Sequence, residues 1–181
     1  MRTFPVTLTL LFASMGMLDA EVYQKGPVAI QEESNEIRQL LLDPPEGELS
    51  DLKDALNVCC KSPSLALMEL ADDPTNLARV RILSLALLSE YPGKEVKSYL
   101  LSVVRNESAH PTFRGWALQS YARGFAQTES EEVRANIKPY LSDLEPMLRA
   151  RAETSMEYIV QNRSTGGSDP MKPMISLLLE D

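Results

Sequence analysis

Apolar residues recur along most of this chain three or four positions apart, which is the spacing of a helix that buries one face. The pattern predicts helices near residues 28–42, 49–59, 62–73, 77–89, 96–104, 113–125, 133–141 and 148–160. Residues 77–89 are apolar on nearly every side, so we expect this helix to be buried all round. Pro139 is expected to kink the seventh helix near its middle.

The second half of the chain repeats itself. The apolar positions of 96–104 recur 37 residues later, and those of 113–125 recur 35 residues later. An arginine lies near the start of three helices, at Arg81, Arg114 and Arg149, with separations of 33 and 35 residues. A period near 35 with two helices per period predicts an all-α fold of the α-solenoid type, a superhelix of about four antiparallel helix pairs. Residues 28–59 would form a degenerate first pair.

These motifs resemble the short HEAT-like repeats, including the repeats of the lyase type. The motifs that carry the resemblance are Asp73-Pro74, Pro111–Arg114 and Pro146–Arg149. The resemblance covers about residues 65–162. It implies that Arg81, Arg114 and Arg149 brace the turns and the stack of repeats instead of contacting a ligand.

The two ends of the chain differ from this repeat region. Residues 1–20 have the pattern of a signal peptide: Arg2, an apolar run over 6–12, and small residues before Ala20. We therefore expect export to a periplasm or secretion, a mature chain from Glu21, and no transmembrane segment after cleavage. The alternative is an apolar N-terminus on a cytosolic protein. The repeat domain would span 21–162.

Residues 163–181 have the composition of a flexible linker followed by a short apolar tail. We favour docking of this tail on the last helix, because the open end of a solenoid needs covering. The alternative is a tethered segment that binds a partner.

Composition narrows the function. The chain has 181 residues, 44% of them hydrophobic, and a net charge of −8. This apolar fraction excludes a disordered chain, and the negative charge argues against nucleic acid as a partner. We favour a plainly solvated surface as the explanation of this charge, and the alternative is an acidic face for a basic partner.

Few residues suit catalysis. His110 is the only histidine, and it precedes a helix-starting proline, so we interpret it as a surface turn residue. We therefore predict no catalytic residue, no cofactor and no enzymatic activity. Cys59 and Cys60 are adjacent, and helix geometry opposes a bond between them. We favour a buried free thiol at Cys59, with an intermolecular disulfide through Cys60 as the alternative. No metal site is predicted, because two cysteines alone cannot supply four ligands.

The resulting hypothesis is a non-catalytic exported scaffold for protein–protein interaction. Solenoids use the exposed ridge of their second helices as a binding surface. The residues expected on that ridge are Gln119, Arg123, Thr154 and Tyr158. One alternative is an accessory or regulatory subunit of an enzyme, or a HEAT-like protein of the lyase type. A further alternative is a structural subunit of an envelope assembly.

Overall fold

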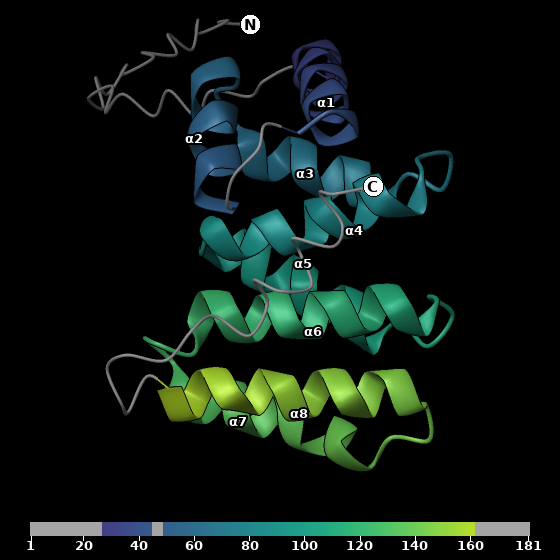
Figure 1. Cartoon of the computed structure of the whole chain (residues 1–181), viewed down its shortest axis with the longest axis vertical. Coiled ribbons are helices and arrows are strands. Elements are labelled where there is room, and N and C mark those ends of the chain that lie inside the picture. The colour runs from purple at the N-terminus through teal and green to yellow at the C-terminus, as the bar shows by residue number, and fades with distance from the viewer. Residues whose placement is uncertain (1–26, 45–48, 162–181) are drawn as a thin grey trace, which may run out of the picture.

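The structure is a computed structural model that describes residues 27–44 and 49–161 (Figure 1). The predicted signal peptide, the linker and the apolar tail all lie outside the described residues. The elements are α1 (Pro27–Leu42), α2 (Leu49–Cys59), α3 (Pro63–Asp72), α4 (Ala78–Leu87), η1 (Leu88–Glu90), α5 (Lys94–Arg105), α6 (Pro111–Phe125), α7 (Ser130–Ile137), η2 (Lys138–Ser142) and α8 (Pro146–Gln161). The part of the chain described contains helices and no strand, so the all-α prediction is confirmed.

Prolines mark several helix boundaries. Pro63, Pro111 and Pro146 are the first residues of α3, α6 and α8. A proline fits this position because the first amides of a helix have no intrahelical acceptor and its φ angle is already helical. The kink expected at Pro139 is instead a change of helix type, since α7 ends at Ile137 and a 3-10 segment follows.

The helices are stacked along the long axis of the molecule, with α1 and α2 at one end and α7 and α8 at the other (Figure 1). From α3 onward, consecutive helices can be taken as pairs: α3 with α4, α5 with α6, and α7 with α8. The second helices of these pairs contact one another, since α6 packs on α4 and on α8. The first helices lie beside their partners, because α5 packs on α6 and α7 packs on α8. At the N-terminal end, α1 packs mainly on α3 and α4.

The core runs through the middle of this stack. Every residue from Ile82 to Ser89 is buried, so the expected burial on all sides is confirmed for this part of the helix. It does not hold for the start of the stretch, where Leu77 and Ala78 are exposed. Burial on all sides also holds in α6, where residues 115–122 are all buried. A helix placed between two others and backed by a third has no face left for water.

The three repeat arginines bind backbone carbonyl groups within their own helix pairs. Arg81 Nε donates to the Ala71 carbonyl oxygen at 2.8 Å, and Arg114 Nε donates to the Val104 carbonyl oxygen at 3.0 Å. Both acceptors lie ten residues earlier, at the end of the preceding helix. The guanidinium thus bonds a carbonyl at a helix C-terminus, where intrahelical donors run out. Arg149 differs, because its acceptors are the carbonyls that precede α8, including Leu144 O at 3.0 Å.

Candidate functional site

The expected binding ridge is largely inside the protein. Gln119 is fully buried and Tyr158 is 8% exposed, so the exposure that helical spacing predicts does not hold for these two residues. The physical reason is the close packing of α6 on α8. The Gln119 Oε1 atom accepts a hydrogen bond from Arg151 Nη1 at 2.7 Å, and the Arg151 guanidinium lies 4.1 Å from the centre of the Trp116 ring.

The other two ridge residues are partly exposed. Arg123 donates from Nη1 to Ser89 Oγ at 2.6 Å and forms an ion pair with Glu90. It therefore ties α6 to η1 across the boundary between two helix pairs. The Thr154 hydroxyl donates to the Ala150 carbonyl oxygen within α8 at 3.0 Å. Both side chains make contacts inside the protein.

The contact of Arg123 with Ser89 belongs to a wider set. Side-chain hydrogen bonds join positions about one period apart in several places. The pairs, with their sequence separations, are Lys97–Glu129 (32), Arg151–Gln119 (32), Arg123–Ser89 (34), Lys97–Glu132 (35) and Thr112–Met147 (35). Each links one helix pair to the next.

The single histidine has a structural contact. His110 is exposed, and its Nδ1 atom accepts a hydrogen bond from the Thr112 amide at 3.2 Å. It therefore satisfies one of the free amides at the start of α6. Its ring also meets Phe113 edge-on, with the ring centres 6.2 Å apart.

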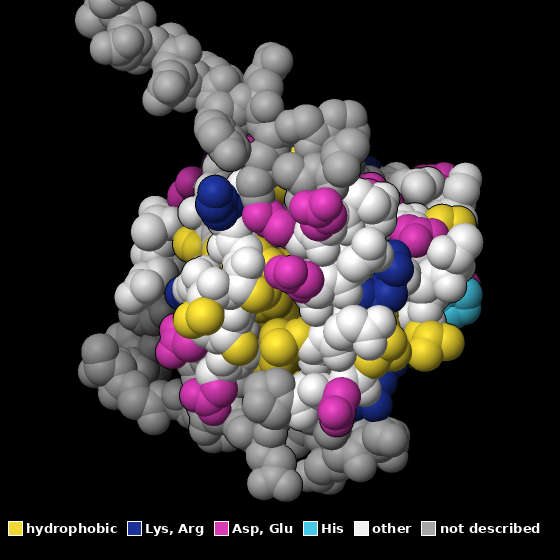
Figure 2. All heavy atoms as spheres, turned by 90° about the horizontal axis from the view of Figure 1, so that it is seen from above, with side chains coloured by type: hydrophobic (Ala, Val, Ile, Leu, Met, Phe, Trp, Pro, Cys, Tyr) yellow, Lys and Arg dark blue, Asp and Glu magenta, His cyan; other side chains and the backbone are white. Residues whose placement is uncertain are grey.

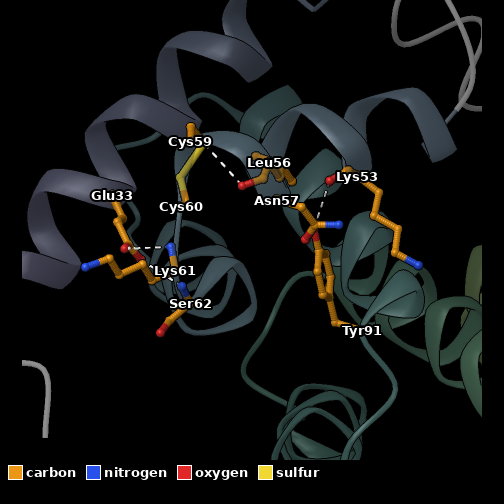
Figure 3. The surroundings of a disulfide bond; sticks show 9 residues. All are labelled: Glu33, Lys53, Leu56, Asn57, Cys59, Cys60, Lys61, Ser62 and Tyr91. Carbon is orange, nitrogen blue, oxygen red and sulfur yellow. Dashed lines mark hydrogen bonds between the residues drawn. A yellow bond between two sulfur atoms is a disulfide. The ribbon is translucent and has the colours of Figure 1, made fainter. Parts of the chain in front are cut away.

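Cys59 and Cys60 form a disulfide with each other (Figure 3). The expectation of a buried free thiol at Cys59 is therefore wrong: Cys59 is exposed and bonded, and Cys60 is the buried member of the pair. The objection from helix geometry fails because α2 ends at Cys59, which leaves Cys60 outside the helix. The bonded Cys59 sulfur lies 3.4 Å from the Leu56 carbonyl oxygen.

A carboxylate from α1 holds the chain just after this disulfide. Glu33 accepts hydrogen bonds from the backbone amides of Lys61 at 2.9 Å and Ser62 at 3.2 Å (Figure 3). Glu33 is itself buried. One turn along α1, the exposed Glu36 carries a carboxylate oxygen that lies within 4.8 Å of both cysteine sulfurs. The sequence gives no local signal for either acid, because both lie more than twenty residues before the cysteines.

The end of the molecule formed by α1 and α2 is acidic. Its acidic residues are Glu32, Glu33, Glu36, Asp51 and Asp54, and its basic residues are Arg38 and Lys53. Both basic groups reach neighbouring elements: Arg38 Nη2 lies 3.6 Å from Asp73 and Lys53 Nζ lies 3.7 Å from Glu90. Among the acids, only Glu33 is buried. Figure 2 shows this end with apolar side chains in the middle of the view and acidic side chains around them.

Asp73 and Glu90, the acids that face Arg38 and Lys53, also contact other groups. Hydrogen bonds from the Thr75 side chain and amide, with Arg38 and Arg81 nearby, lower the pKa of Asp73. Glu90 lies between Lys53 and Arg123 and so connects α2, η1 and α6. The two basic side chains of α1 and α2 therefore both face acids on other elements.

Comparison with known proteins finds no matching family model, no similar curated protein and no similar solved structure. Within residues 27–44 and 49–161, no helix has both the length and the apolar character needed to cross a membrane.

Proposed function

We propose that this protein is a non-catalytic helical-repeat scaffold that binds another protein, and that the partner offers a basic, partly apolar segment to the end formed by α1 and α2. The observation that carries the proposal is the charge of this end. Glu32, Glu36, Asp51 and Asp54 are exposed to solvent, and the two basic groups of α1 and α2, Arg38 and Lys53, contact acids on other elements. Exposed apolar side chains accompany these acids, including Val58 at 89% and Leu42 at 39%.

Charge and apolar surface have different parts in such binding. An exposed ion pair contributes about 0.2–1 kcal/mol to binding. The four acids would therefore affect the orientation and association rate of the partner more than its affinity. The apolar side chains supply the remaining driving force when they are covered. We therefore expect the interaction to weaken as the ionic strength rises, because salt screens exposed charges beyond about 10 Å at 0.1 M.

A HEAT-like solenoid is the architecture that we propose for this scaffold. The polar contacts between positions 32 to 35 residues apart support it, because neighbouring repeats of a solenoid touch at equivalent positions. The matching bonds of Arg81 and Arg114, each to a carbonyl ten residues earlier, also support it.

We propose that the scaffold works outside the cytoplasm, in a periplasm or as a secreted protein. The support is the pattern of residues 1–20 together with the Cys59–Cys60 disulfide, since disulfides persist in oxidising compartments. N-terminal sequencing of the protein recovered from the exported fraction tests this. A mature chain that begins at Glu21 is expected, and an intact Met1 on cytosolic protein would contradict it.

The binding surface is tested by charge reversal. The variant Glu32→Lys/Asp54→Lys alters the α1–α2 end, and Glu153→Lys/Glu157→Lys alters exposed positions of α8 by the same charge. Each is used as bait beside the wild type, with mass spectrometry of the proteins retained from the exported fraction. A partner that is kept by the wild type and the α8 variant, and lost by the α1–α2 variant, is the expected result. Equal retention by all three baits rejects this surface, and the absence of any partner rejects the scaffold. Circular dichroism checks that both variants keep their helicity.

A further inference from the structure

Three potential metal ligands lie together at the disulfide, namely its two sulfurs and the carboxylate of Glu36. The Cys59 sulfur, the Cys60 sulfur and a carboxylate oxygen of Glu36 all lie within 4.8 Å of one another. Cys59 and Glu36 are exposed, whereas Cys60 is buried. The group is therefore open to solvent on one side and enclosed by the protein on the other.

The disulfide is accessible to reduction because the Cys59 sulfur belongs to an exposed residue. In thiol–disulfide exchange, the thiolate of a dithiol reductant attacks the Cys59 sulfur, and Cys60 leaves as a thiolate. The second thiol of the reductant then attacks the mixed disulfide and releases Cys59. The reductant supplies two electrons and becomes a disulfide, and its two thiol protons balance those taken up by the cysteines.

We propose that the reduced form binds one thiophilic divalent cation, of which Zn²⁺ is the reference, through Cys59, Cys60 and Glu36. Thiolates and carboxylates are both common zinc ligands, and three protein ligands with one water complete a tetrahedral site. This composition meets the objection that two cysteines alone supply too few ligands. Binding displaces the two thiol protons into solvent, since the ligands must be deprotonated. The site shares Glu36 with the proposed protein-binding end, but it is argued from the approach of Glu36 to the two sulfurs and not from protein binding.

The distances allow this arrangement. Zinc–sulfur bonds of about 2.3 Å and zinc–oxygen bonds of about 2.1 Å place a sulfur and an oxygen about 3.6 Å apart around a tetrahedral ion. The corresponding separation of two sulfurs is about 3.8 Å. The Glu36 oxygen must therefore approach by about 1 Å from its limit of 4.8 Å. An exposed glutamate achieves this by side-chain rotation.

Glu33 is the positioning residue of this site. It lies on the same helix as Glu36, yet its carboxylate is occupied by the amides of Lys61 and Ser62. These bonds fix the chain that follows Cys60 against α1 and so keep the sulfurs next to Glu36. Groups that orient metal ligands in this way typically change metal affinity by about 10–100-fold when they are removed.

The experiment compares oxidised and reduced full-length protein. The disulfide is reduced with a phosphine, the reductant is removed without oxygen, and Zn²⁺ is titrated by calorimetry. Cd²⁺ is titrated in parallel, since its charge-transfer absorption reports thiolate ligands. One equivalent of metal is expected to bind the reduced protein, with a thiolate band and proton release, and the oxidised protein is expected to bind at least tenfold more weakly.

Matched variants identify the carboxylate. Glu36→Gln should weaken Zn²⁺ binding by about tenfold or more, whereas Glu32→Gln, one turn away on α1 and also exposed, should leave it unchanged. Cys59→Ser should abolish both the zinc affinity and the cadmium band. Equal affinity of the oxidised and reduced forms overturns the site, and so does an unchanged affinity in Glu36→Gln. Circular dichroism confirms that each variant is folded.

Discussion

Replacing Gly115 with alanine adds a methyl group where α6 lies against the Arg151 side chain of α8. A Cβ atom at this position would lie 2.8 Å from Arg151 Cγ and 3.3 Å from Arg151 Cβ. These atoms belong to the stem of the arginine side chain, which cannot swing aside as its tip can. The tip is also held, because Arg151 donates to Gln119 and lies over the Trp116 ring.

Two effects of opposite sign decide the outcome. Alanine is better than glycine in a helix interior by about 1 kcal/mol, which favours the folded variant. Overpacking costs about 1–3 kcal/mol. Displacing Arg151 from the buried Gln119 removes a charged hydrogen bond that contributes about 1.5–3 kcal/mol. We therefore expect Gly115→Ala to lower the free energy of unfolding by about 1–3 kcal/mol.

Urea unfolding of the full chain measures this change, with Gly93→Ala as the control. Gly93 precedes α5 in extended backbone, and the nearest atom to an added Cβ is 3.9 Å away. The double variant Gly115→Ala/Arg151→Ala removes the Cγ contact, so its effect should be smaller than the sum of the two single effects. A Gly115→Ala protein that is more stable than the wild type would refute the close approach.

Two further predictions concern single side chains. Arg114→Ala should lower the free energy of unfolding by about 1.5–3 kcal/mol, because the Val104 carbonyl loses its charged donor. Arg105 is exposed, so the control Arg105→Ala should change the free energy of unfolding by less than about 0.5 kcal/mol. Equal effects of the two substitutions in urea unfolding would contradict the bracing role of Arg114. Burial, with Glu90 and Asp54 nearby, raises the pKa of Tyr91 from 10.0 to about 12. Between these values the folded protein keeps the Tyr91 proton, whereas the unfolded chain releases it. The resulting contribution to the free energy of unfolding is complete below pH 10 and is lost as the pH rises to 12. Urea unfolding from pH 9 to 12 should show a shallower decline in Tyr91→Phe, and identical slopes would exclude this contribution.

The helices and their order could be predicted from the sequence because apolar spacing is a local property. The run from Ile82 to Leu88 is a clear case, since a stretch with no polar face can only be buried. The ridge could not be predicted in the same way. Gln119 is polar and falls at a position that helical spacing leaves outside, yet Arg151, 32 residues later, covers it and supplies its hydrogen bond. The sequence does not distinguish a buried glutamine that has a hydrogen-bond partner from an exposed one.

The disulfide shows why adjacency in sequence is a poor guide to the chemistry of two cysteines. The objection to a bond between Cys59 and Cys60 assumes that both lie in one helix, and this assumption fails by a single residue. Glu33 holds the chain beyond the end of this helix. Its carboxylate accepts hydrogen bonds from the amides of Lys61 and Ser62, which lie 28 and 29 residues later in the sequence. The same packing of α1 brings Glu36 to the sulfurs. The packing of α1 thus places Glu33 on the chain that follows Cys60 and Glu36 at the sulfurs, and we expect Glu33→Gln to disturb both contacts together.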